Sequence, residues 1–111
     1  MPYSARPVHE AKADVFRVLG HPARVRILEL LRDGERSVGA LQAELELDSG
    51  GTSQHLSALR RIGLVESRRE GTSVYYRVAN GHAFELLEAG RAIISRRLAE
   101  QQSILDELGT P

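Results

Sequence analysis

Cysteine is absent from the 111 residues, which excludes disulfides, thiolate metal ligands, thiol nucleophiles and thiol-based redox sensors. No apolar run approaches the roughly 20 residues that a membrane span requires. The N-terminal sequence MPYSARPVHE also lacks the apolar stretch of a signal peptide. We therefore expect a cytoplasmic protein that has no membrane partner.

An excess of charge of one sign is also absent, but the charges are unevenly distributed along the chain. The 15 lysines and arginines balance the 15 aspartates and glutamates. Residues 50–77 nevertheless contain five arginines and two glutamates, a net charge of +3, whereas residues 29–48 have a net charge of −4. Only a local basic region, and not the chain as a whole, could therefore attract a polyanion.

The length and the hydrophobic content of 41% allow one compact domain. We expect residues 1–9, which contain two prolines, to be loosely ordered and residues 10–108 to form this domain. The spacing of apolar residues predicts a helix that ends at Gly20 and a second helix that starts at Pro22 and stops at Gly34. The second helix is apolar around much of its circumference, as is typical of a central buried helix.

Two short helices are predicted in the next part of the chain. Ser37 is a suitable N-cap for an amphipathic helix that extends to about Leu45. Asp48 is a suitable N-cap for the following helix, which has a single apolar stripe and ends near Gly63. A tight turn at about residues 47–48 joins the two helices.

A β-hairpin and a long helix complete the chain. Residues 64–70 and 73–79 have the composition of strands, and Gly71–Thr72 between them indicates a hairpin turn. Tyr75 and Tyr76 alternate across their strand, so we expect one in the core and the other at the surface.

The helix predicted from His82 to Leu108 has more apolar surface than a solitary outer helix needs, because its apolar residues form two adjacent stripes. We expect one stripe to pack on the body and the other to pack on a second copy of the chain. The predicted interface of this homodimer comprises Val15, Leu87, Ile94, Leu98 and Leu105. The alternative is that both stripes surround a single core.

The order helix, helix, helix, turn, helix, hairpin, helix is that of a winged helix-turn-helix domain. The segments LGHPARVRILELL and LSALRRIGLVESRREGTSVYYRV closely resemble the ArsR/SmtB family of small bacterial transcriptional repressors, and the resemblance extends over residues 10–105. It implies a mainly α fold with a small β-hairpin, in which 37–45 and 48–62 form the helix-turn-helix and 64–78 the wing. The N- and C-terminal helices would form the dimer interface.

The resemblance also implies a homodimeric repressor that occupies a pseudo-palindromic operator on double-stranded DNA and is released by an inducer. A recognition helix needs short or planar polar side chains near its N-terminal turns, where it enters the major groove. The predicted DNA-binding residues on the helix are Ser49, Thr52, Ser53, Gln54, His55, Arg60 and Arg61, and those on the wing are Arg68, Arg69 and Arg77. As alternatives, His55 is a surface histidine without a partner, and Arg60 and Arg61 are paired with nearby acids.

Two glycines, Gly50 and Gly51, stand where the family usually has larger polar residues. Glycine costs about 1 kcal/mol relative to alanine in a helix. Either this turn is irregular in the free protein and becomes ordered on DNA, or glycine allows close approach of the backbone to a phosphate.

The residues that hold metals in similar proteins are largely missing. The segment LQAELEL has no cysteine, and at the start of the last helix Asn80 replaces the usual aspartate. His82 remains, but Ile93 and Arg96 occupy the positions where a histidine and an acid would be expected. We therefore expect no metal and no cofactor. The inducer would be an organic ligand or a protein, unless the abundance of the protein itself regulates it.

Two other classes of function fit the sequence less well. An enzyme would need a nucleophile with a base, a phosphate-binding loop after a strand, or paired carboxylates in an apolar setting, and none stands out. The segment SGG before TSQH lacks the lysine and the preceding strand of such a loop. A winged-helix module that antagonises another regulator by binding protein would show the same periodicity, but it would not need the arginines of the wing.

Overall fold

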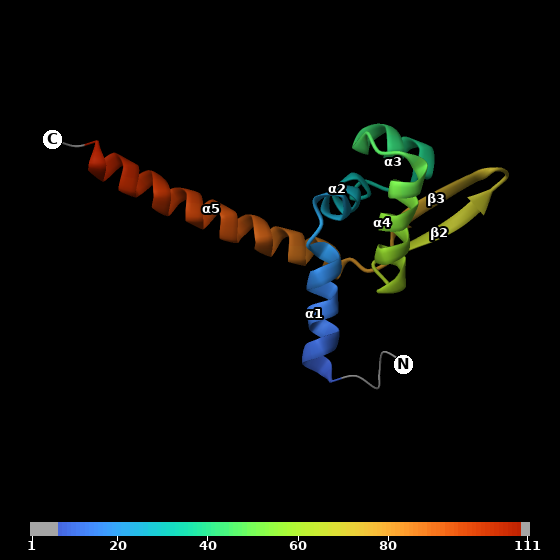
Figure 1. Ribbon diagram of the computed structural model, residues 1–111, viewed down its shortest axis with the longest axis horizontal. Coiled ribbons are helices and arrows are strands. Elements are labelled where there is room, and N and C mark those ends of the chain that lie inside the picture. The colour runs from blue at the N-terminus through green and yellow to red at the C-terminus, as the bar shows by residue number, and fades with distance from the viewer. Residues whose placement is uncertain (1–6, 110–111) are drawn as a thin grey trace.

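The computed structural model describes residues 7–109, which form five helices and a three-stranded antiparallel sheet (Figure 1). In chain order the elements are α1 (Val8–Leu19), α2 (Pro22–Leu30), β1 (Arg36–Ser37), α3 (Val38–Leu45), α4 (Ser49–Arg61), β2 (Val65–Glu70), β3 (Ser73–Val78) and α5 (His82–Leu108). This order confirms the mainly α, winged helix-turn-helix fold.

The core surrounds α2, as its apolar circumference predicts. Ile27 and Leu28 are fully buried, and they lie in one cluster with Val18 of α1, Leu41 of α3 and Leu59 of α4. Each of the four N-terminal helices therefore contributes an apolar face to the same core. Burial of side chains of this size stabilises the fold by about 1.5–3 kcal/mol each.

The helix-turn-helix segment has the N-caps that its sequence predicts. The Ser37 hydroxyl accepts a hydrogen bond from the Ala40 N–H at 3.1 Å, and the Asp48 carboxylate accepts one from the Gly51 N–H at 2.7 Å. Between the helices, Glu46 has a φ of 54° and ends α3 in the left-handed conformation. These local interactions fix where α3 ends and where α4 begins.

The sheet contains one strand that the sequence does not predict. Strands β2 and β3 form the expected hairpin, with Gly71 in its turn at a φ of 62°. The short strand β1 pairs antiparallel with β3 on its other edge, with Arg36 opposite Tyr76 and Ser37 opposite Tyr75. Since β1 has two residues, it is too short to show a strand periodicity. Tyr76 is buried and Tyr75 half-buried, consistent with opposite faces.

The first helix begins before the predicted domain boundary. Pro7 is its N-cap, and Val8 and His9 lie in its first turn, so the loosely ordered segment predicted over residues 1–9 is wrong at these positions. Residues 1–6 lie outside the described part of the chain. The Pro7 carbonyl oxygen accepts hydrogen bonds from the N–H groups of Glu10 and Ala11 at 3.0 and 3.1 Å, so the helix starts directly after Pro7.

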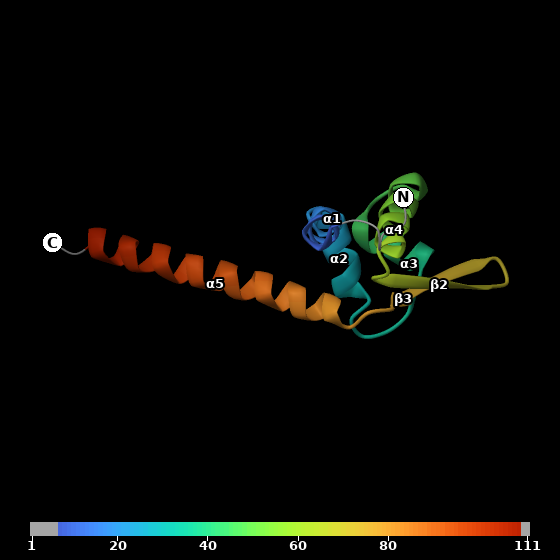
Figure 2. The same cartoon turned by 90° about the horizontal axis from the view of Figure 1, so that it is seen from below.

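Helix α5 leaves the body on the side opposite the hairpin and extends far beyond the other elements (Figures 1 and 2). A helix of 27 residues is about 40 Å long. The radius of gyration is 17.8 Å, whereas a compact domain of this length has about 13 Å. Most of α5 is thus not covered by its own chain.

Candidate nucleic-acid interface

Helix α4 has one buried face and one exposed polar face. Its buried residues are Thr52, Leu56, Ala58 and Leu59, which face the core. Its exposed residues are Ser49, Gly50, Ser53, Gln54, Ser57, Arg60 and Arg61. Residues 50, 53, 54, 57, 60 and 61 follow helical spacing, so they form a single stripe along the helix. A stripe of small and planar polar groups that ends in two arginines is suited to contacts with base edges and phosphates.

Ser57 belongs to this stripe, although it is not among the DNA-binding residues predicted from the sequence. It lies three residues after Gln54 and four after Ser53, and it is exposed. The helical period from Ser53 alone would have identified it.

The predicted DNA contact of Thr52 is wrong. Thr52 is fully buried, and its hydroxyl donates a hydrogen bond to the Asp48 carbonyl oxygen at 3.0 Å. Its side chain lies on the face that carries Leu56 and Leu59, at positions i+4 and i+7. Thr52 therefore holds the first turn of α4 on the body, and its side chain is not exposed to a ligand.

His55 also differs from its prediction, because its imidazole faces α2 and not the exposed stripe. The Arg24 Nε donates a hydrogen bond to His55 Nδ1 at 3.1 Å, and the His21 and His55 rings are 4.2 Å apart. Burial lowers the pKa of His55, and the neighbouring His21 and Arg24 lower it further. His55 is therefore neither a free DNA contact nor a surface histidine without a partner.

Gly50 and Gly51 lie within regular helix in the free chain. A Cβ atom at Gly51 would stand 3.0 Å from the Asp48 Oδ1 that caps the helix, whereas one at Gly50 would have 3.8 Å to the same atom. Glycine at position 51 thus leaves room for the cap. Because Gly50 is exposed and has no side chain, a phosphate can approach the backbone closely at the N-terminal end of the stripe.

The three arginines of the wing lie on two faces of the hairpin. Along β2, Val65, Ser67 and Arg69 alternate with Glu66, Arg68 and Glu70. Val65 is buried, and Ser67 is opposite the buried Tyr76, so Arg69 lies on the face that continues from the core. The Arg60 guanidinium donates a hydrogen bond to Ser67 Oγ at 3.4 Å, which places α4 on this same face.

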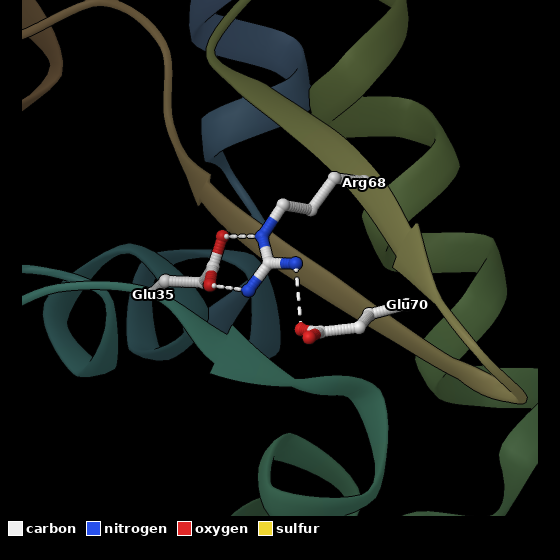
Figure 3. Close-up of polar contacts among 3 residues, drawn as sticks. All are labelled: Glu35, Arg68 and Glu70. Atoms are coloured by element: carbon white, nitrogen blue, oxygen red, sulfur yellow. Dashed lines mark hydrogen bonds and ion pairs between the residues drawn. The ribbon is translucent and has the colours of Figure 1, made fainter.

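On the other face, Arg68 is held by two carboxylates (Figure 3). Its Nε and Nη2 donate to the two oxygens of Glu35 at 2.7 and 2.6 Å, and its Nη1 donates to Glu70 at 2.9 Å. The guanidinium also lies over the Tyr75 ring, 4.6 Å from its centroid. The hydrogen bonds from Arg68 lower the pKa of Glu35, and the two carboxylates raise the pKa of Arg68.

Arg77 on this outer face is also neutralised. It is opposite Glu66 in the register, and the two side chains form an ion pair. A phosphate that contacted Arg68 or Arg77 would have to displace a carboxylate from each of them. Among the described residues, Arg61 and Arg69 have no carboxylate partner, and Arg60 contacts the Ser67 hydroxyl and not an acid.

The surface predicted to form the dimer interface is largely exposed in the single chain. On α5, the exposed fractions are 59% for Ile94, 59% for Leu98 and 61% for Leu105. Leu87 is partly buried against the core, and Val15 of α1 is half-buried. An open groove of about 1030 Å³ between α1, α2 and the first half of α5 is lined by apolar residues that include Phe16, Leu19, Val25, Leu87 and Ile94.

No group of three or more His, Asp or Glu side chains among residues 7–109 is arranged to hold a metal ion. His82 of α5 has Glu85 as its neighbour, with 3.1 Å between His82 Nδ1 and the carboxylate. In the same part of the chain, every helix is too short or too polar to cross a membrane.

Comparisons with known proteins agree with this geometry. The family model described as "Bacterial regulatory protein, arsR family" matches residues 21–67. The chain is 41% identical over 105 residues to the uncharacterized HTH-type transcriptional regulator Rv0081 of Mycobacterium tuberculosis, and this match covers 94% of the chain and 92% of that protein. It is 42% identical over 81 residues to the biofilm growth-associated repressor of Agrobacterium fabrum, covering 73% of the chain and 69% of the repressor.

Solved structures show the same fold. The crystal structure of Rv0081 superposes with a TM-score of 0.78 at 42% identity, covering 86% of this chain and 97% of that one. The solution structure of the homodimeric winged helix-turn-helix DNA-binding domain Mb0332 from Mycobacterium bovis has a TM-score of 0.72 at 35% identity, covering 82% of this chain and 84% of that one.

Proposed function

Because the chain belongs to the ArsR family of bacterial regulatory proteins, we propose that it is a homodimeric transcriptional repressor that binds a pseudo-palindromic operator. Helix α4 enters the major groove, where Ser53, Gln54 and Ser57 contact base edges. Arg60 and Arg61, further along the same stripe, contact backbone phosphates. The protein acts on DNA in the bacterial cytoplasm.

The observation that carries this proposal is the division of α4 into two faces. The buried face fixes the helix on the core, while the opposite face is polar along its whole length, and the exposed side chains of Ser53, Gln54 and Ser57 form no hydrogen bond or ion pair within residues 7–109. Since a helix that enters a groove needs this arrangement, α4 is suited to sequence recognition. Ser49 and Gly50 at its start supply further polar surface.

The dimer follows from the exposed apolar face of α5. A second copy that covers Ile94, Leu98 and Leu105 would remove these side chains from water and place two α4 helices on one side of the assembly. A two-fold dimer reads an inverted repeat whose half-sites are about one helical turn apart. Since the chain has no thiol to sense an oxidant, release would depend on an organic ligand or a protein, unless regulation acts through the abundance of the repressor itself.

Affinity selection of the purified protein against random duplex DNA tests the proposal. The expected result is an enriched inverted repeat with half-sites about 10 base pairs apart, bound with an affinity that falls steeply as salt rises. If no sequence is enriched at low salt, the DNA-binding function is wrong, and a module that antagonises another regulator by binding protein becomes the better proposal.

A pair of wing variants tests which arginine contacts DNA. Arg69→Ala should weaken binding to every duplex and reduce the slope of log affinity against log salt by about one, because one phosphate contact is lost. Arg68→Ala should reduce the slope less, because Arg68 is already paired with Glu35 and Glu70. Fluorescence anisotropy over a salt series measures both slopes. Equal slopes for the two variants would contradict the assignment of the two hairpin faces.

A further inference from the structure

Arg24 connects three helices at the point where α1, α2 and α4 meet. It lies in the first turns of α2 and is half-buried. Its Nε donates a hydrogen bond to His55 Nδ1 on α4 at 3.1 Å, and its Nη1 donates to the Val18 carbonyl oxygen at the end of α1 at 3.3 Å. One guanidinium group therefore links the recognition helix to the helix that carries part of the dimer surface.

The hydrogen bonds of this cluster require neutral imidazoles. His21 is the N-cap of α2, and its Nδ1 accepts a hydrogen bond from the Ala23 N–H at 3.1 Å. His55 Nδ1 accepts from Arg24 Nε, as described above. A ring nitrogen can accept only while it carries no proton, so both rings must hold their single proton on Nε2. The centroids of the His21 and His55 rings are 4.2 Å apart, so two neutral rings lie beside the positive charge of Arg24.

A proton added to His55 would oppose its contacts with Arg24 and with His21. Protonated Nδ1 would point a donor at the Arg24 donor, and the charged ring would face the positive guanidinium. The titratable and charged groups that act on the His55 imidazole are His21 and Arg24 of α2. Among the described residues, no carboxylate from α3, β2 or α4 itself offsets them. Protonation of His55 would therefore remove the hydrogen bond that joins α2 to α4.

We propose that Arg24 and His21 are positioning residues that hold the recognition helix through His55, and that protonation of His55 weakens operator recognition in acid. The inference rests on the proposed function, because it assigns a regulation to the same helix α4. The three-helix link also ties the position of α4 to α1. A small displacement at this link changes the fit of both helices to their half-sites.

The first test is the ratio of affinities for the selected operator and for a scrambled duplex, at pH 7.5 and pH 5.0 and constant ionic strength. The ratio should fall by about tenfold or more in the wild type, since a hydrogen bond to a charged group is lost and a repulsion replaces it. Non-specific binding should strengthen in acid, because the protein gains positive charge.

His55→Asn retains an acceptor for Arg24 but cannot titrate, and its ratio of affinities should change less than about twofold over this pH range. His82→Asn, at an exposed histidine on α5, should behave as the wild type.

A second measurement needs no DNA and separates this inference from the proposed function. In the free protein, NMR titration should show His55 protonated at a lower pH than an ordinary histidine, together with loss of amide-exchange protection in α4 at acid pH. His55→Asn should keep this protection. A wild-type affinity ratio that is constant between pH 7.5 and 5.0, or an α4 whose protection is the same at both, would overturn the inference.

Discussion

Replacing Gln54 by alanine should lower the preference for the operator over an unrelated duplex by about tenfold or more. Gln54 is exposed in the middle of the polar stripe of α4, and its planar amide can donate to and accept from one adenine edge. A good bidentate contact contributes about 1–3 kcal/mol of discrimination, and the dimer presents the side chain twice. Affinities for operator and unrelated duplex, measured at the same salt concentration, give the preference.

The matched control for this variant is Gln102→Ala. Gln102 is also an exposed glutamine in a helix, but it lies on α5 and hydrogen-bonds to Asp106 at 2.9 Å, far along the chain from α4. It should leave the preference unchanged. If Gln54→Ala weakens binding to both duplexes equally, Gln54 contacts the backbone. If it weakens neither, the assigned stripe of α4 does not lie in the groove.

Leu98→Glu should convert the dimer into a monomer and reduce operator affinity by about 100-fold or more. Leu98 is 59% exposed in the single chain and lies with Ile94 and Leu105 on one stripe of α5. A carboxylate placed in an apolar interface would be buried without a partner, which is strongly unfavourable. A monomer engages one half-site, so the gain from linking two binding events is lost. Sedimentation equilibrium and operator titration measure the two effects.

Ser103→Glu is the matched control on the same helix. At 100° per residue, Ser103 lies on the side of α5 opposite Ile94 and is exposed. The added charge should leave the dimer and the operator affinity as in the wild type. A dimer that survives Leu98→Glu would show that this stripe is not the interface, whereas a dimer lost in both variants would indicate general damage to α5.

Several features of the fold can be predicted from sequence because they depend on neighbours along the chain. The N-caps Ser37 and Asp48, the Pro22 helix start and the Gly71 turn each act within a few residues, and all four are found. The exact extent of α5 follows from its long periodicity. The strand β1 has only two residues, which are too few to show a periodicity. It can therefore be identified only from its pairing in the tertiary structure.

The candidate site was only partly predictable. The polar stripe follows from helical spacing, and the same spacing would have assigned Thr52 to the buried face and Ser57 to the exposed one. His55 lies beside the boundary of the two faces, where spacing alone does not decide which way an imidazole turns. The contacts of His55 with Arg24 and His21 determine the orientation of its imidazole.

Sequence alone predicts the helices, the hairpin, the apolar stripe of α5 and the five arginines in residues 50–77. Which of these arginines remain available to a polyanion depends on tertiary contacts. Glu35 and Arg68 are separated by 33 residues, and Arg24 and His55 by 31. An ion pair or hydrogen bond forms only at contact distance, and such distances depend on how the α2–β1 loop passes the hairpin and how α2 meets α4.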